Sequence, residues 1–335
     1  MHFLVTGTAG FIGFHTAHAL LERGDSVVGL DNLNNYYDPA LKIARLERLR
    51  AYNLFTFAEL DLADRNEMAE LFHRETFQRV IHLGAQAGVR HSLTDPYSYV
   101  DSNVMGTLNV LEGCRYTDVE HLTFASTSSV YGSHTDMPFS VHTHTDHPLA
   151  IYASTKRAME HMAHSYAHLY RLPCTGLRFF TVYGPWGRPD MALFLFTRNM
   201  LAYEPIDIYN YGNHLRDFTY IDDIVDGVLR ASNRVAKPDP SWDPQAPDTA
   251  TSDAPWRIYN IGTAQPVPLM RFVEVLEREL GVEAEKRYYP LQPGDVPETH
   301  ADISDLARDT GYEPQVSVEE GVKRFVQWYR WYYDV

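Results

Sequence analysis

Three closely spaced glycines, Gly7, Gly10 and Gly13, constrain the fold of this chain more than any other sequence feature. An apolar stretch at residues 2–6 precedes them, and a helix-like stretch that ends at residue 23 follows. Glycine lets a backbone turn sharply and approach a pyrophosphate, while the free N–H groups of a helix start attract its charge. The pattern predicts a dinucleotide-binding β-loop-α unit, with a glycine turn that binds no ligand as the alternative.

Asp31 closes the next apolar stretch, residues 26–30. A carboxylate at this strand end can accept hydrogen bonds from an adenosine ribose and would repel a 2′-phosphate, so we expect NAD rather than NADP. Asp61 and Leu62 follow a third strand and are placed to contact the adenine. The cofactor contacts predicted from these strands and loops are Gly7, Gly10, Phe11, Ile12, Gly13, Asp31, Asp61, Leu62 and Ala85.

Apolar strands alternate with helical stretches six times along the first 180 residues. This order predicts an α/β fold, a Rossmann-type doubly wound parallel sheet. We expect residues 1–180 to form the NAD-binding domain, with residues 212–260 returning to it. Residues 181–211 and 261–335 are expected to form a smaller substrate-binding lobe. Residues 237–257, rich in Pro, Asp, Ser and Thr, predict a mobile surface loop.

Tyr152 and Lys156 lie four residues apart, which places them on the same face of a predicted helix. An ammonium beside a phenol favours the phenolate, so we expect Lys156 to lower the pKa of Tyr152 from about 10 toward that of a useful general base. A cluster of hydroxyls at residues 126–129 ends the strand at residues 122–125, where ligands of open α/β sheets bind. A Tyr-x-x-x-Lys pair alone is also common on protein surfaces.

Arg90 ends a stretch of small residues, 84–89, that follows the fourth strand. Small residues there would let the backbone pass close to the cofactor. The arginine is either an ordinary surface charge or a contact to the phosphates of a substrate, and the sequence leaves both open.

The composition excludes several classes of function. A formal net charge of −15 argues against nucleic acid or an anionic membrane as the partner, and no apolar stretch reaches the 18 residues of a membrane span. The start of the chain lacks a basic segment, so we expect no signal peptide. Cys114 and Cys174 lie in apolar segments, which favours reduced thiols of a cytoplasmic protein. Residues 142–147 hold three of the 16 histidines without helical spacing, so we expect no metal site.

The chain resembles the extended short-chain dehydrogenase/reductase family of nucleotide-sugar enzymes over essentially its whole length. Within that family it is most similar to the UDP-glucuronate 4-epimerases. The stretch at residues 178–191 is the most specific; the others are residues 31–39, 85–90, 216–223 and 291–297.

This resemblance implies a role for each matching residue. Tyr152 would be the general base and acid, Lys156 would bind the nicotinamide ribose, and Thr127 would take the place of the catalytic Ser or Thr. Tyr152 and Lys156 would both contact the cofactor. The residues that would hold the sugar carboxylate are Ser128, Ser129, Thr181 and Arg188, and Arg216 would bind the diphosphate. The implied reaction is C4 epimerisation of UDP-glucuronate through a 4-keto sugar, with tightly bound NAD as the hydride carrier.

Ser129 helps to separate the alternatives within the family. Related dehydratases and decarboxylases carry Glu at this position, just before Val-Tyr-Gly, so their acid is missing here. The third alternative is a 4-epimerase of neutral UDP-sugars, but a neutral sugar would offer no partner for the charge of Arg188. An NAD-binding sensor or scaffold without catalysis would not need the complete set of Thr127, Tyr152 and Lys156.

Two long predicted helices, residues 96–114 and 151–171, resemble the pair that forms a four-helix dimer interface in this family. The alternative is that they only cover the sheet. We expect a homodimer that binds a UDP-sugar, with no nucleic-acid partner and no membrane insertion.

Overall fold

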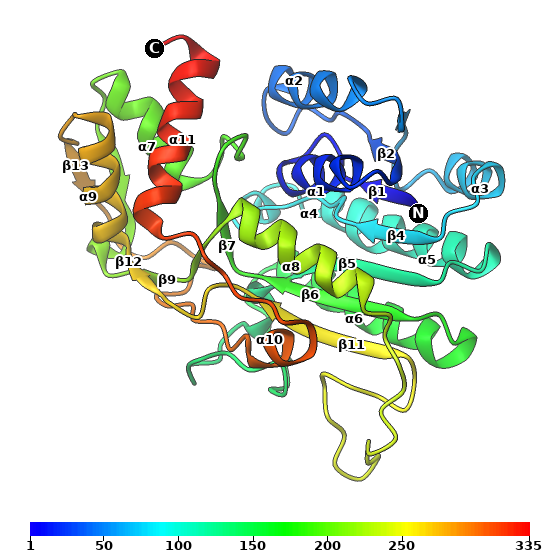
Figure 1. Cartoon of the computed structure of the whole chain (residues 1–335). Helices are drawn as coiled ribbons and strands as arrows, with labels where there is room; N and C mark the ends of the chain where they lie inside the picture. The colour runs from blue at the N-terminus through cyan, green and yellow to red at the C-terminus, as the bar shows by residue number, and fades with distance from the viewer.

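The computed structural model describes residues 1–335, and a seven-stranded parallel sheet forms its centre (Figure 1). The strand order is β11-β6-β5-β4-β1-β2-β3, and every neighbouring pair is parallel. The predicted Rossmann-type fold class is therefore confirmed. The strands are β1 (His2–Thr6), β2 (Ser26–Asp31), β3 (Phe55–Glu59), β4 (Arg79–His82), β5 (His121–Thr127), β6 (Cys174–Phe179) and β11 (Trp256–Ile261).

Helices cover both faces of this sheet, and successive strand residues pack into different cores. In β1, Phe3 and Val5 join one apolar cluster, while Leu4 joins the other. This alternation explains why the strands read as continuous apolar stretches, since both faces are buried. The first cluster includes residues of α1 (Phe11–Glu22), α2 (Pro39–Arg50) and α8 (Ile221–Asn233); the second includes residues of α3 (Arg65–Arg74), α5 (Gly106–Tyr116) and α6 (Ile151–Tyr170).

The first of the two long predicted helices is not regular. Between α4 (Pro96–Tyr99) and α5 lies the π-helical segment η2 (Val100–Met105). The wider turn directs the buried Asn103 side chain between two other segments. Its Nδ2 donates to the Gln86 carbonyl at 3.1 Å and to Thr155 Oγ1 at 3.0 Å, and its Oδ1 accepts from the Gln86 N–H at 2.8 Å. The irregular turn thus ties the loop after β4 to α6.

A smaller lobe packs beside the sheet, at the left of Figure 1. Its short strands pair as β7 with β10, β9 with β12, and β8 with β13. The remaining elements are β7 (Thr181–Tyr183), α7 (Ala192–Leu201), β8 (Ile206–Ile208), β9 (Leu215–Arg216), β10 (Phe218–Tyr220), β12 (Val267–Pro268), α9 (Leu269–Leu280), β13 (Lys286–Tyr288), α10 (Ser304–Thr310), α11 (Val318–Tyr333), and the short helical turns η1 (His91–Leu93), η3 (Ser128–Tyr131) and η4 (Tyr209–Gly212).

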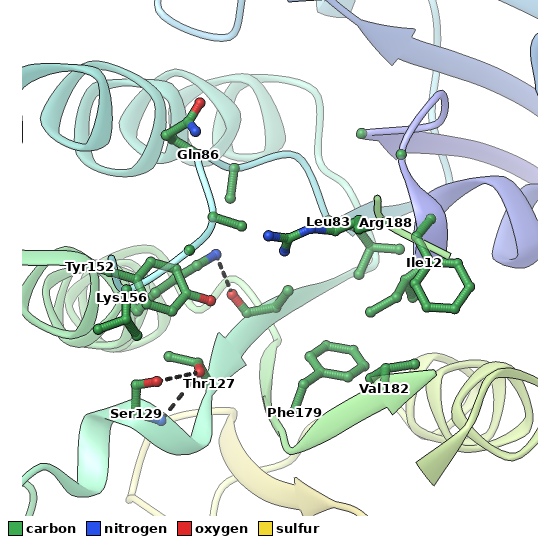
Figure 2. Close-up of a pocket in the computed structure, with 18 of the residues that line it drawn as sticks. Ile12, Leu83, Gln86, Thr127, Ser129, Tyr152, Lys156, Phe179, Val182 and Arg188 are labelled. Atoms are coloured by element: carbon green, nitrogen blue, oxygen red, sulfur yellow. Dashed lines mark hydrogen bonds between the residues drawn. The ribbon is translucent and has the colours of Figure 1, made fainter. Parts of the chain in front are cut away.

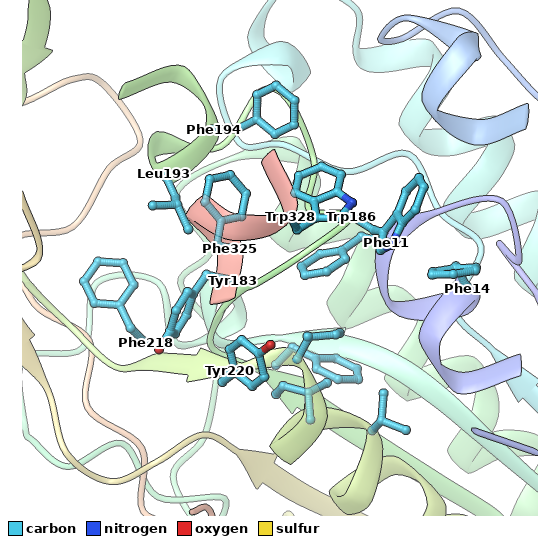
Figure 3. Packing of buried hydrophobic residues seen from close by; sticks show 14 of the residues in the cluster. Phe11, Phe14, Tyr183, Trp186, Leu193, Phe194, Phe218, Tyr220, Phe325 and Trp328 are labelled. Atoms are coloured by element: carbon cyan, nitrogen blue, oxygen red, sulfur yellow. The ribbon is translucent and has the colours of Figure 1, made fainter. Parts of the chain in front are cut away.

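Aromatic side chains join the lobe to the sheet (Figure 3). Trp328 of α11 is buried, with its ring centroid 5.3 Å from that of Trp186 and 6.2 Å from that of Phe194. Trp186 in turn lies 5.7 Å from Phe14 of α1. One apolar cluster therefore runs from the glycine-loop helix into the lobe, which holds the two parts together.

The predicted surface loop at residues 237–257 is only partly a surface loop. Its first half is largely exposed, but Ala250, Ser252 and Ala254 are fully buried, and β11 already begins at Trp256. Small side chains let this stretch pack against the second core, a role that its polar composition conceals.

The structure also places the two cysteines and the histidine-rich stretch considered above. Cys114 and Cys174 are buried and free. His142 lies 2.8 Å from Asp248 and 3.2 Å from Asp305, and no group of His, Cys, Asp or Glu side chains comes together as a metal site. None of the helices combines the length and apolar character needed to cross a bilayer.

Replacing Trp328 by Ala tests the aromatic joint. We expect the free energy of unfolding to fall by about 3–5 kcal/mol, because a large buried ring leaves a cavity. Trp331→Ala, on the same helix but 64% exposed, is the matched control and should cost about 1 kcal/mol or less. Urea unfolding followed by circular dichroism measures both, and equal losses would contradict the packing described here.

Candidate active site

One large cavity lies at the carboxyl ends of the central strands, where the order of the sheet reverses between β1 and β4 (Figure 2). It brings together residues predicted from segments far apart in the sequence. Those that line it are Gly7, Gly10, Phe11, Ile12, Gly13, Asp31, Asp61, Leu62, Ala85, Thr127, Ser128, Ser129, Tyr152, Lys156, Thr181, Arg188 and Arg216.

The glycine loop forms one wall of this cavity and has no room for side chains. Gly7 has a φ of +72°, and a Cβ placed there would lie 2.7 Å from the Gly84 nitrogen. A Cβ on Gly13 would lie 2.0 Å from the Gly7 carbonyl oxygen. Helix α1 starts after Gly10 without a side-chain cap, so its first N–H groups are available to an anion.

Asp31 lies at the end of β2 and is held by backbone N–H groups. Its carboxylate accepts hydrogen bonds from Ala9 at 3.2 Å and Leu33 at 2.9 Å. Burial raises the pKa of Asp31, and the charge of the neighbouring Lys42 opposes this rise. Lys42 also lines the cavity and donates to the Asn34 carbonyl and side chain, both at 2.8 Å. Sequence reasoning missed Lys42, since it looks like one of the surface charges of helix α2.

Tyr152 and Lys156 project from the first turns of α6 toward the end of β5 (Figure 2). Lys156 Nζ donates to the Ala125 carbonyl at 2.9 Å, and burial lowers the pKa of Lys156 to about 7. Burial also raises the pKa of Tyr152, and the groups that oppose this rise are the Thr127 hydroxyl and the Arg188 charge. The expectation that Lys156 would bring the pKa of Tyr152 below 10 is therefore wrong for the surroundings that the chain itself supplies, because desolvation dominates both groups.

A buried ion pair fixes α6 against the sheet one turn beyond Lys156. Glu160 accepts from Arg178 Nε and Nη2, both at 2.9 Å, and from the Ser126 hydroxyl at 2.5 Å. Arg157 adds a third cationic contact at 2.6 Å. Burial alone would raise the pKa of Glu160, but these partners hold it at about 2, so the carboxylate stays charged.

Hydroxyl groups line the wall beside Tyr152. Thr127 Oγ1 donates to Ser129 Oγ at 3.2 Å and accepts from the Ser129 N–H at 3.2 Å. Arg188 reaches into the cavity from the loop after β7, with its guanidinium directed toward Tyr152 and Lys156 (Figure 2). Its Nε and Nη2 contact Asp190 at 3.0 and 2.5 Å.

The two remaining predicted arginines differ in position. Arg216 lines the cavity and is held by the loop after β13, where it donates to Asp295 at 3.0 Å and to the Val296 carbonyl at 2.6 Å. Arg90 does not line the cavity. Its side chain is 55% exposed, stacks 4.6 Å from the Tyr209 ring centroid and lies 3.9 Å from Asp295.

Several residues that shape the site were not predicted individually. Tyr36 and Asp190, which form a hydrogen bond, lie inside two stretches that carry the family resemblance. These stretches indicated the right part of the chain but not these two residues. Glu160, eight residues after Tyr152, could have been noticed as a charge on the buried side of an amphipathic helix.

Comparison with known proteins identifies the class to which this fold and cavity belong. Residues 3–262 match the model of the NAD dependent epimerase/dehydratase family. A probable UDP-glucuronate 4-epimerase of Rhizobium meliloti is 49% identical over 98% of this chain and 97% of its own length. UDP-glucuronate 4-epimerase 1 of Arabidopsis thaliana is 48% identical over 98% of this chain and 77% of its own length. A crystal structure of UDP-glucuronic acid 4-epimerase from Bacillus cereus, with UDP-glucuronic acid and NAD, superposes with a TM-score of 0.89 at 32% identity, covering 99% of this chain and 100% of that one.

The fold and site are those of a dinucleotide-dependent sugar-nucleotide enzyme, and the chain belongs to the NAD dependent epimerase/dehydratase family. The residues fit NAD, because the side-chain-free wall at Gly7 and Gly13 leaves space for a pyrophosphate beside the uncapped start of α1. Asp31 lines the same cavity at the end of β2, and a carboxylate can accept hydrogen bonds from ribose hydroxyls.

Replacing Lys156 by Met tests the electrostatics of the site. The pKa of Lys156 is about 7 in the folded protein and 10.5 in the unfolded chain, so between these values the folded protein binds fewer protons. Its stability therefore rises with pH over this window, and the cost of burying the charge is fully present below pH 7. In protein stripped of nucleotide, Lys156→Met should raise the thermal midpoint most near pH 6, with the difference narrowing toward pH 10. If the difference in thermal midpoint between Lys156→Met and wild type stays constant or widens as the pH rises, the lowered pKa of Lys156 is contradicted.

Proposed function

We propose that this protein interconverts UDP-glucuronate and UDP-galacturonate by inverting the configuration at C4, using tightly bound NAD. The observation that carries the proposal is the shared position of Thr127, Tyr152 and Arg188 in one cavity: a proton-transfer pair and a cation meet there. The similar proteins named UDP-glucuronate 4-epimerase support the choice of sugar.

Tyr152 removes the proton from the sugar 4-OH, and Thr127 relays it. When bound, NAD supplies the chemistry of oxidation and reduction by taking a hydride from C4 and returning it to the other face of the 4-keto sugar. Thr127 and Arg188 both lower the proton affinity of Tyr152 against the effect of its burial, which favours its action as a base. The same phenol returns the proton in the second half of the cycle.

The carboxylate on C5 needs protection in this reaction. Beside a C4 ketone it belongs to a β-keto acid, in which the C5–carboxylate bond can break to release CO₂. We propose that Ser128, Ser129, Thr181 and Arg188 hold the carboxylate charged, with its C–C bond out of line with the carbonyl π system. Ser129 stands where a dehydratase or decarboxylase would carry Glu.

The parts of the chain have distinct proposed roles. Residues 1–180 with 212–260 bind NAD, and residues 181–211 and 261–335 bind the UDP-sugar. Arg216 lies within 212–260, but its strand β9 pairs with β12 of the lobe, and it binds the diphosphate of the UDP-sugar. Arg90, at 55% exposure, would reach the substrate only at the mouth of the cavity.

We also propose a homodimer formed through α4, α5 and α6. Exposed apolar side chains on these helices and on η2, which joins α4 to α5, support it: Tyr97, Val100, Met105, Tyr116, Leu169 and Tyr170. A monomer-sized mass in light scattering at micromolar concentration would contradict it. The two free, buried thiols support a place in the reducing cytoplasm.

The function is tested by mixing purified protein with UDP-glucuronate, without added cofactor, and identifying products by NMR. We expect UDP-galacturonate from the wild type. Tyr152→Phe should lose activity by at least about 10²-fold, because the general base is gone. The variant should still co-purify with NAD. UDP-pentose with CO₂, or no product even with added NAD, would overturn the proposal.

Arg188→Ala tests the protection of the carboxylate. The variant should bind UDP-glucuronate more weakly, by about 10-fold or more, because a charge-assisted hydrogen bond is lost. Part of its product should be decarboxylated, as detected by released CO₂. Unchanged turnover with unchanged products would show that Arg188 does not have this role.

A further inference from the structure

Arg188 is held from the side by Asp190. The two carboxylate oxygens accept from Nε and Nη2 at 3.0 and 2.5 Å, which is a side-on bidentate pair. This pair occupies one edge of the guanidinium and leaves the Nη1 edge for another acceptor. Only 23% of the Arg188 side chain is exposed, so the pair is largely shielded from water.

Asp190 is held in turn by Tyr36. The Tyr36 hydroxyl donates to Asp190 Oδ2 at 3.0 Å, and the Arg188 guanidinium carbon lies 6.0 Å from the centre of the Tyr36 ring. Burial and the Asp190 charge raise the pKa of Tyr36 to about 12, so its hydroxyl remains a donor at neutral pH. Arg188 and the Tyr36 hydrogen bond hold the pKa of Asp190 below its ordinary value, so it stays a carboxylate.

The position of the Tyr36 hydroxyl is itself confined. A Cβ placed on Gly88 would lie 2.7 Å from this oxygen, so the loop after β4 needs a glycine there to admit it. Tyr99, from α4, fixes the same loop by donating to the Gly88 carbonyl at 2.5 Å. The segment after β2, the loop after β4 and the loop after β7 therefore come together around the Tyr36 hydroxyl.

We propose that Asp190 and Tyr36 are positioning residues that direct the Nη1 edge of Arg188 at the carboxylate of a UDP-uronic acid, and so make the site selective for uronic acids over neutral sugars. The inference rests on the proposed function. Because Arg188 and Asp190 cancel in net charge, the pair attracts anions in general less than a free arginine would. Instead, the pair presents hydrogen-bond donors of Arg188 in a fixed direction, and these bind only a carboxylate that lies in the matching position.

Tyr36 also gives the two halves of the site a physical connection. It lies five residues after Asp31, which closes β2 at the proposed ribose position. Order in this segment therefore bears on both the proposed cofactor contact of Asp31 and, through Asp190, the orientation of Arg188.

The test uses Asp190→Ala and Tyr36→Phe in the NAD-loaded enzyme. Asp190→Ala should raise the KM and the calorimetric Kd for UDP-glucuronate by about 10-fold or more, with kcat within about 3-fold, because the truncated pair no longer orients the arginine. Tyr36→Phe should raise both by about 3-fold, since it removes one hydrogen bond. The Ki of UDP-glucose, which lacks the carboxylate, should stay within about 2-fold for both.

Matched controls remove similar contacts elsewhere. Asp226→Ala breaks an exposed aspartate–arginine pair with Arg230, and Tyr52→Phe removes a tyrosine–carboxylate hydrogen bond to Glu22. Both should leave KM and the UDP-glucose Ki unchanged. Asp190→Glu, which keeps the charge but shifts it, should recover only part of the affinity if direction matters.

The outcomes are distinct. A KM for UDP-glucuronate that is unchanged or falls in Asp190→Ala would mean that Asp190 competes with the substrate, and would overturn the inference. A parallel loss of UDP-glucose binding would mean general damage to the cavity and would also overturn it. If the wild type and both controls form no UDP-galacturonate, the proposed function fails instead. The calorimetric Kd values of UDP-glucuronate and UDP-glucose, compared between wild type and Asp190→Ala, then still test the orientation of Arg188.

Discussion

The buried pair of Glu160 and Arg178 is the interaction on which the geometry of the site depends. It joins α6 to β6, while the Ser126 hydroxyl adds the end of β5 to the same carboxylate. Lys156 lies one turn before Glu160, so the pair sets how far α6 can slide or turn relative to the sheet. A fully buried charged pair is an expensive way to hold a helix, and its cost is consistent with a demand for precise placement rather than for stability.

The sheet could be predicted because its signals are local. Strands such as β1, β2 and β6 are largely apolar stretches of about the length that a parallel, doubly covered strand needs. No other residue type fits at positions 7 and 13, because a side chain at either would collide with the backbone. The π turn at residues 100–105 could not be predicted, because it depends on the partners that Asn103 finds in two other segments.

The predicted site residues other than Arg90 do line the cavity, but their electrostatics could not be predicted. Spacing placed Tyr152 and Lys156 together, yet only the fold sets their burial, and desolvation shifts the pKa of both in the direction of the neutral form. Asp190 pairs with Arg188, two residues before it, but its hydrogen bond with Tyr36, 154 residues away in the sequence, could not be predicted. Arg90 illustrates the reverse case, since its sequence context suggested the cavity while its side chain is mostly exposed.

The central claim is that one cavity oxidises and reduces the same carbon without releasing the hydride. UDP-glucuronate carrying deuterium on C4 tests it most directly, with purified protein in ordinary water and no added cofactor. We expect UDP-galacturonate that keeps the deuterium on C4, because the hydride never leaves the site defined by Tyr152 and the glycine wall. Product that has lost the deuterium to solvent would contradict it.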